Sequence, residues 1–448
     1  MIKDKTQNMI KIAVPAVLES LVTVIVTTID TKMISVLGKQ QISAVSFTTQ
    51  PKLIFFAIFF ALGTATSVFT AQAFGKKDKE EANRYFISVM RISTILAIVL
   101  GILLAVFARP VMMLCNRQPD TIDMSVSFFR IVMGFMVFQS LSTVMNAALR
   151  GLGKMKVTLY SNIGLGIVDI IFNYLLIEGH LGFPRLEIAG DAIATVLGTV
   201  AATMISFFAI RKNSDYLSLR SIFDLKTRSG KDVTNNIRSK AGNIVFENIF
   251  TRIGFLLSSI ITSGLSSDKT AVYTVAMILL AYSFAFGDGI QNAVISLTGR
   301  SFGAKQYDDL RQYYRVSIMI GILCSVFLCA VYTGGSNFFF GLYFNDKDSV
   351  SEGFKMSCIA AGLTILQILR IINIGTMRGM GEVKDPRRIA TACVLFINPG
   401  LSFLFTALMN MEIWGIWLSS IITQMVWYIV SAVMCRKHLK RYTTEKEN

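Results

Sequence analysis

Apolar stretches long enough to cross a lipid bilayer recur along nearly the whole length of this 448-residue chain. A membrane-spanning helix needs roughly 20 mainly apolar residues, and repeated runs of this length leave a chain no water-solvated surface. The composition agrees, because 53% of the residues are apolar and 16% are charged, against about 25% charged in an average soluble domain. We therefore interpret the chain as a polytopic, all-helical membrane protein.

The spacing of the apolar stretches predicts twelve helices, and lysines precede the first of them without the cleavage site of a signal peptide. We expect these helices at residues 9–37, 43–75, 84–109, 121–150, 155–179, 187–211, 236–264, 270–301, 312–336, 350–379, 386–410 and 413–435. Most Lys and Arg residues fall in the loops on one side. The loops on the other side hold six, namely Lys39, Arg109, Arg117, Arg185, Lys269 and Lys347.

This asymmetry of charge predicts the orientation of the chain. Cytoplasmic loops carry an excess of Lys and Arg, so both termini are expected in the cytoplasm of a cell inner-membrane protein. The net charge of +16 then has a topological origin, and we expect no nucleic-acid partner.

Parts of the sequence repeat at a constant distance. The segment TAQAFGKKDKEEANRY, which begins at Thr70, returns as TGRSFGAKQYDDLRQY at Thr298, and LRGLGKMK returns as MRGMGEVK. Each pair is separated by 228 residues, and Glu19 and Glu247 share this offset. Three marks that hold one spacing predict an internal duplication. Because each half contains an even number of helices, the two repeats are expected to be parallel.

The duplication predicts two six-helix bundles, at residues 1–211 and 237–448, which a polar cytoplasmic linker joins at residues 212–236. In two-bundle transporters the solute site lies near the membrane midplane between the bundles, and one bundle rocks against the other. We therefore expect twelve transmembrane helices around a central cavity. The two RGxG segments, at Arg150 and Arg378, are interpreted as tight, basic, lipid-facing turns on the inner side.

Several motifs together mark a known family. Pro15 and Asp30 lie in the first predicted helix, AQAFG follows the second, and LRGLGK follows the fourth. The segments DIIFNYLLIEGHLGFP and AGDAIAT cover the fifth and sixth. Over nearly its full length the chain resembles the multidrug and toxic compound extrusion (MATE) transporters. The resemblance implies a twelve-helix fold and the export of organic, often cationic, compounds in exchange for Na⁺ or H⁺.

Polar residues inside the predicted helices of the first half are candidates for the coupling-ion site, because a charge at the centre of a spanning helix costs about 2.5–3.5 kcal/mol. Asp30 follows Pro15, which permits a kink in the first helix. Asp169 and Asn173 share one face of the fifth helix at i, i+4, and Thr195 in the sixth adds a hydroxyl. Asp30, Asp169 and Asn173 are thus candidate ligands of a monovalent cation, or the carboxyl groups carry a proton instead.

The ion site of the MATE family is similar, with an Asp in the first helix, two polar residues in the fifth and a Thr in the sixth. In the family pattern Asn precedes Asp in the fifth helix, whereas here Asp169 precedes Asn173. The exchange keeps the charge of the site and leaves its ligand geometry open.

Glu247 in the seventh predicted helix and its repeat-mate Glu19 form a second candidate group. A branch of the MATE family has an acidic residue at the position of Glu247 that is implicated in cation coupling. We expect the two carboxylates to attract a cationic solute into the cavity. The alternatives are that Glu247 pairs with Arg252 or Arg370, or that it lies near the inner membrane interface.

Gln139 and Gln367 are a further repeat pair, each 11 residues before an RGxG arginine. In part of the family the second of these positions carries an Asp that is linked to the cation. The side chain of Gln367 can bind an ion through its carbonyl oxygen but cannot titrate, so an ion site in the second half stays open.

One rival function is a flippase or exporter of lipid-linked or polysaccharide intermediates, which shares the two-bundle plan. That function calls for several cationic residues to hold pyrophosphate, and Arg252 and Arg370 are the evident candidates. An enzyme is not expected, because the sequence contains no HExxH or GxSxG motif and no nucleotide-binding GxxxxGK[ST] loop. We expect a monomer that needs no cofactor besides the coupling ion, with drug-like small molecules and the lipid bilayer as partners.

Overall fold

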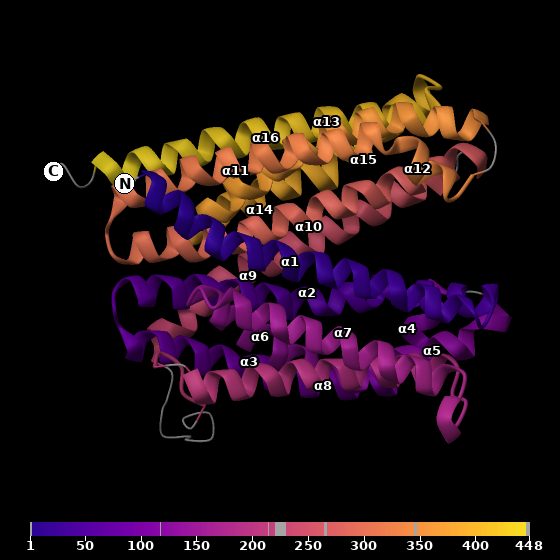
Figure 1. Ribbon diagram of the computed structural model, residues 1–448, viewed down its shortest axis with the longest axis horizontal. Helices are drawn as coiled ribbons and strands as arrows, with labels where there is room; N and C mark the ends of the chain where they lie inside the picture. The colour runs from indigo at the N-terminus through magenta and orange to yellow at the C-terminus, as the bar shows by residue number, and fades with distance from the viewer. Residues whose placement is uncertain are drawn as a thin grey trace. The chain divides into compact units, whose positions relative to one another are not determined.

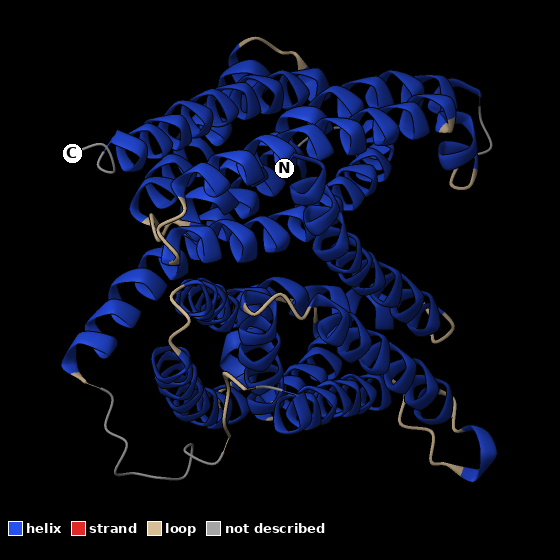
Figure 2. Cartoon of the chain, turned by 60° about the vertical axis from the view of Figure 1, so that its left-hand side comes forward, coloured by secondary structure: helices blue, strands red, loops and turns tan. Residues whose placement is uncertain are grey.

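The computed structural model describes residues 2–116, 118–213, 215–219, 230–263, 267–344 and 347–444, and these ranges contain helices and turns but no strand (Figure 2). Figure 1 colours the chain from indigo to yellow in the order of the helices. The first half comprises α1 (Ile2–Ser35), α2 (Lys39–Gly75), α3 (Lys79–Val106), α4 (Ala108–Cys115), α5 (Pro119–Gly134), α6 (Met136–Gly151), α7 (Met155–Ile177), η1 (His180–Gly182) and α8 (Ile188–Asn213). The second half comprises α9 (Lys231–Ser263), α10 (Ser267–Gly303), α11 (Tyr307–Gly334), α12 (Ser336–Gly341), α13 (Lys347–Gly379), α14 (Lys384–Ala390), η3 (Thr391–Ile397), α15 (Asn398–Phe403), η4 (Leu404–Leu408) and α16 (Glu412–Thr444).

Most of the predicted helices are also apolar enough to cross a membrane. Among the described residues, ten single spans meet this condition, and α5 with α6 forms an eleventh that bends by 48°. The eleventh predicted helix, residues 386–410, corresponds to one continuous span from α14 to η4, in which the segments η3 and η4 are π-helical. The remaining predicted helix, residues 236–264, is present as α9, but its sequence is not apolar enough to be identified as a membrane span. Four charged residues explain this: Arg238, Lys240, Glu247 and Arg252.

The bend between α5 and α6 differs from the single straight helix predicted at residues 121–150. It falls at Phe135, whose backbone angles of φ −101° and ψ 16° lie outside the helical region. Gly134 directly precedes it, and glycine weakens a helix by about 1 kcal/mol relative to alanine. The break therefore follows from a local weakness that hydropathy does not register.

Contacts divide the chain into two compact units, one of Met1–Ser20 with Phe246–Asn448 and one of Leu21–Val245. Both division points lie inside long helices, so α1 and α9 each contribute their beginning to one unit and their end to the other. The predicted bundle boundary at residues 212–236 stays a prediction. Residues 220–229 of that linker, together with residue 214 and the predicted outer-loop residue Arg117, lie outside the described residues.

Glycines set the close helix packing around the first-half polar residues. A Cβ atom on Gly166 of α7 would lie closer than 3.0 Å to the side chain of Val26 on α1. A Cβ on Gly198 of α8 would lie 2.9 Å from the carbonyl oxygen of Leu165 and 3.2 Å from the Cβ of Asp169. Small residues let helix backbones approach in this way. The helix α8 therefore packs tightly against α7, and α1 approaches α7 closely at Gly166.

The RGxG segments also serve packing. A Cβ on Gly151 or on its repeat-mate Gly379 would lie well inside 3.0 Å of a threonine hydroxyl, that of Thr70 or Thr298 respectively. The interpretation as lipid-facing turns is wrong for Arg378, whose exposed fraction is 8%. Arg378 is instead held in the interior by Glu247 and Gln291.

Candidate functional site

Three carboxyl groups and one amide meet in the first half of the chain. Asp30 lies on α1, Asp169 and Asn173 lie on α7, and Asp191 lies on α8. The Asn173 amide Nδ2 donates to Asp30 Oδ1 at 2.6 Å, and the Thr195 hydroxyl donates to the Asp169 carboxylate. The carboxyl groups of Asp30 and Asp191 lie within hydrogen-bonding reach of one another. We call Asp30, Asp169, Asn173 and Asp191 the carboxyl cluster.

Most of the carboxyl cluster is removed from solvent. The exposed fractions are 4% for Asp169, 1% for Asp191 and 0% for Asn173. Four of its buried oxygens have no hydrogen-bond donor within the described part of the chain: Asp169 Oδ1, Asn173 Oδ1 and both carboxyl oxygens of Asp191. A buried polar atom without a partner is costly, so these oxygens call for protons or a cation.

The oxygen ligands of the cluster suit a monovalent cation better than a transition metal. Carboxylate and amide oxygens are hard ligands, and neither cysteine nor histidine belongs to the group. No set of three or more His, Cys, Asp and Glu side chains in the described ranges is grouped closely enough to hold a metal ion. The donor set therefore fits a cation bound by few carboxylates together with amide and hydroxyl oxygens, or one or two protons.

In the described part of the chain, one lysine acts electrostatically on all three carboxyl groups. Lys52 on α2 interacts electrostatically with Asp191, Asp30 and Asp169, and its ammonium lies 5.1 Å from the centroid of the Phe128 ring. With every group ionised, three negative charges would face one positive charge. The carboxyl cluster therefore needs additional positive charge to be neutral.

The sequence analysis singled out Asp30, Asp169, Asn173 and Thr195 but missed Asp191 and Lys52. The rule that identified Asp30 applies equally to both missed residues, since each is a charge inside an apolar stretch. Asp169 and Asn173, whose order is reversed relative to the family pattern, interact with different helices. Asn173 donates to Asp30 on α1, and Asp169 accepts from Thr195 on α8.

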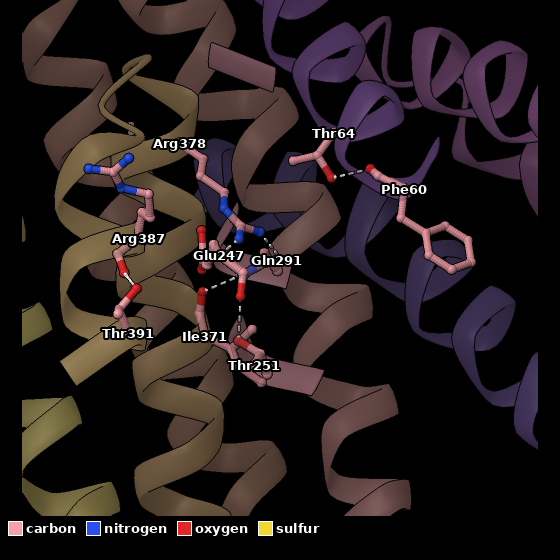
Figure 3. A network of polar contacts seen from close by, with 9 residues as sticks. All are labelled: Phe60, Thr64, Glu247, Thr251, Gln291, Ile371, Arg378, Arg387 and Thr391. Carbon is pink, nitrogen blue, oxygen red and sulfur yellow. Dashed lines mark hydrogen bonds and ion pairs between the residues drawn. The ribbon is translucent and has the colours of Figure 1, made fainter. Parts of the chain in front are cut away.

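A second buried polar group occupies the second half (Figure 3). The Glu247 carboxylate pairs with the Arg378 guanidinium at 2.9 Å, and Arg378 also donates to Gln291 Oε1 at 3.3 Å. The Gln291 amide donates in turn to the carbonyl oxygen of Ile371 at 3.1 Å. Glu247 thus pairs with the RGxG arginine, and neither of the predicted partners, Arg252 and Arg370, forms this ion pair.

The other predicted cavity residues are Glu19, Gln139 and Gln367. Glu19 is 4% exposed on α1, and the neighbouring Ser20 donates to Asp288 Oδ2 at 3.3 Å. Gln367 on α13 is 7% exposed, and the Gln139 amide on α6 donates to Thr143 at 3.3 Å. Their predicted role in binding a solute stays a prediction.

Pro15 lies inside α1, which continues as one helix through it. Asp288 was not singled out by the sequence analysis. Its position inside the apolar helix α10 is the signal that could have identified it.

Comparison with known proteins identifies the family. A family model described as MatE matches residues 15–175 and, a second time, residues 244–404. The chain belongs to the MatE family. The double match also agrees with the duplication predicted from the sequence, and the prediction of a MATE-family membrane transporter is confirmed.

Two similar proteins illustrate this membership. The "Uncharacterized transporter YisQ" of Bacillus subtilis (strain 168) is 24% identical over 426 residues, which cover 94% of this chain and 92% of that protein. The "Probable multidrug resistance protein YoeA" of the same organism is 24% identical over 389 residues, covering 85% and 82%.

Solved structures of MATE-family and related transporters have the same fold. An outward-facing multidrug resistance MATE transporter of the MOP superfamily matches with a TM-score of 0.90 at 17% identity, over 98% of this chain and 96% of that one. A MOP superfamily transporter from Pyrococcus furiosus matches with a TM-score of 0.90 at 17% identity, over 98% and 97%. The predicted fold class, a helical membrane protein of two six-helix bundles, is confirmed.

Proposed function

We propose that this MATE-family transporter exports organic, often cationic, small molecules and takes up Na⁺ or H⁺ in exchange, by alternating access. Membership of the family, whose relatives include proteins named for multidrug resistance, supports the export of drug-like compounds. The carboxyl cluster supports the coupling to a cation, because it gathers acidic groups that lack sufficient positive charge.

The observation that carries the proposal is the set of four buried oxygens without donors in the carboxyl cluster. Asp191 is the extreme case, with an exposed fraction of 1% and neither carboxyl oxygen accepting from a donor among the described residues. A proton or a cation between Asp191 and Asp30 would remove both the unsatisfied oxygens and the repulsion of two like charges. Binding of the ion would thus favour close packing of α1, α7 and α8, and its release would favour their separation.

This charge-controlled packing is a means of coupling ion binding to a change of conformation. A ligand shifts a conformational equilibrium only by its differential affinity for the two states. Here the loaded state would reduce the net negative charge of the cluster, and the empty state would leave carboxylates to repel across α1, α7 and α8. One cation that enters down 100 mV supplies about 2.3 kcal/mol. At about 1.4 kcal/mol per factor of ten, this supports a gradient of roughly 50-fold for a neutral solute.

The test is solute efflux in proteoliposomes under independently imposed Na⁺ and pH gradients. We expect Asp30→Asn and Asp191→Asn to lose most of the gradient-driven efflux while the protein remains folded in the membrane. The matched control is Glu178→Gln, an exposed acid at the end of α7 that lies outside the cluster. Wild-type efflux in both aspartate variants would remove the carboxyl cluster from the coupling mechanism. The gradient that drives efflux in the wild-type protein identifies the ion.

We also propose that the transporter lies in the cell inner membrane with both termini in the cytoplasm. The bacterial source of the relatives and the distribution of Lys and Arg between the predicted loops support this orientation.

A further inference from the structure

The buried polar group of the second half contains more positive than negative charge. We define the arginine cluster as Glu247, Gln291, Arg370, Arg378 and Trp427. Arg378 is neutralised by Glu247 at 2.9 Å (Figure 3). The Gln291 side chain accepts a hydrogen bond from Arg378 through its oxygen and donates one to the Ile371 carbonyl through its nitrogen. Two guanidinium groups and one carboxylate leave one positive charge, and that charge belongs to Arg370.

Part of the Arg370 guanidinium lacks a hydrogen-bond partner. Its exposed fraction is 7%, and its Nε atom is buried without a partner among the described residues. Glu247 acts electrostatically on Arg370, but its Oε1 bonds Arg378, and its Oε2 has no hydrogen-bond partner within the described ranges. Buried charges in proteins are normally paired or bound to a ligand. Arg370 is therefore an incomplete site.

The contact of Arg370 with Trp427 leaves its hydrogen-bonding edge available. The guanidinium carbon lies 3.7 Å from the centroid of the indole ring, so the flat face of the group stacks on the ring. The N–H groups of a guanidinium lie in its plane and match the two oxygens of a carboxylate or phosphate. Stacking of this kind fixes the plane of the guanidinium group and leaves its N–H groups available to an acceptor.

The duplication separates this cluster from the parts of the fold that both halves need. Within the segment whose repeats fix the offset, subtracting 228 residues places Ser142 at the position of Arg370 and Gly63 at that of Gln291. The first half therefore builds its bundle without an arginine or an amide at these two positions. The arginine cluster is an addition of the second half.

We propose that Arg370 binds the anionic group of an organic solute, a carboxylate or a phosphate monoester, in the second half of this transporter. Trp427 would hold the guanidinium in place, and apolar residues that pack with Trp427, among them Ile374 and Val394, would contact the apolar part of the solute. The site is distinct in chemistry from the carboxyl cluster, which favours cations. Solutes that carry an acidic group are thus within the range of compounds that the protein recognises.

The test measures thermal unfolding of the purified full-length protein in detergent with four probes. Benzoate and phenyl phosphate carry the anionic group on an aromatic ring, benzamide is the neutral match, and chloride is the inorganic anion. We expect saturable stabilisation by benzoate or phenyl phosphate and none by benzamide or chloride at equal concentration. Equal stabilisation by benzamide would indicate apolar binding alone, and equal stabilisation by chloride a site for inorganic anions only; either result would overturn the proposal.

Substitutions assign the binding to Arg370. Arg370→Gln should weaken the apparent affinity for the anionic probe by about 10- to 100-fold, as expected for loss of a charged hydrogen-bonding partner. Because Arg370 is not paired, this variant should fold without the probe. Lys355→Gln, an exposed cation on the same helix α13, is the control and should bind as the wild type does.

Arg370→Lys keeps the charge and loses the planar fork, and its affinity should fall between those of wild type and Arg370→Gln. This variant also decides the question if Arg370→Gln does not fold. If the variant that folds binds the anionic probe with wild-type affinity, the assignment to Arg370 is overturned.

Discussion

Replacement of Gly151 by alanine should destabilise the protein through a collision between helices. The glycine ends α6, and a Cβ there would lie 2.5 Å from the carbonyl oxygen of Ser67, 3.1 Å from the backbone nitrogen of Ala71 and closer still to the Thr70 hydroxyl. Two of these neighbours are backbone atoms of α2, which cannot rotate away as a side chain can. The substitution therefore requires α2 and α6 to separate.

The expected cost follows from this geometry. Forcing a methyl group into a well-packed region costs about 1–3 kcal/mol, and backbone neighbours place Gly151→Ala near the upper end. Alanine is a better helix former than glycine by about 1 kcal/mol, which opposes the loss. The net destabilisation is then about 2 kcal/mol. Gly362→Ala on α13 is the matched control, because nothing lies within 4 Å of its added Cβ, and it should gain up to about 1 kcal/mol.

Thermal unfolding of the two purified variants in the same detergent checks this difference, which amounts to about 3 kcal/mol or more than 100-fold in the folding equilibrium. Thr70→Ala should relieve only part of the Gly151→Ala defect, because it removes the hydroxyl and leaves the Ser67 carbonyl in place. Equal stability of Gly151→Ala and Gly362→Ala would show that the RGxG glycine does not fix the distance between α2 and α6.

Two further predictions concern the second half and the topology. Glu247→Gln should destabilise the protein by about 3–5 kcal/mol, because it leaves the buried Arg378 guanidinium without its carboxylate. Arg378→Gln should cost less, because Glu247 still acts on Arg370, and the losses of the two substitutions should not add; additive losses in thermal unfolding would contradict the ion pair. Single cysteines near Arg185 should react with an impermeant thiol reagent in intact cells and those near Lys440 only after permeabilisation, in a background without the native cysteines, and the reverse pattern would exclude cytoplasmic termini.

The helices were predictable from the sequence because the bilayer imposes one length and one composition on each of them. One interruption was not, and it has a local cause. Gly134 and Phe135 bend the fourth predicted helix without changing its hydropathy, whereas α9 was predicted at residues 236–264 in spite of its charges. Periodicity and hydropathy average over many residues, whereas a bend depends on one or two.

The candidate site was only partly predictable. Asp30, Asp169 and Asn173 could be chosen because each is polar within an apolar run, but the same signal at Asp191 and Lys52 was not weighed. The partner of Glu247 was not deducible from the sequence. Pairing depends on which faces of α9 and α13 meet.

The duplication also separates what the fold requires from what each half has added. The packing pairs are kept in both repeats, since Gly151 with Thr70 corresponds to Gly379 with Thr298. The acid that α1 contributes to the carboxyl cluster is not kept, because Ser258 occupies the position equivalent to Asp30.

The arginine cluster shows the opposite change, because Arg370 has Ser142 as its repeat-mate. One copy has therefore accumulated buried carboxylates and the other an unpaired guanidinium on the same helical framework. A single ancestral charge pattern would have predicted equal sites in both halves. The divergence instead supports a division of labour, in which the first half binds the driving cation and the second half contributes to the choice of solute.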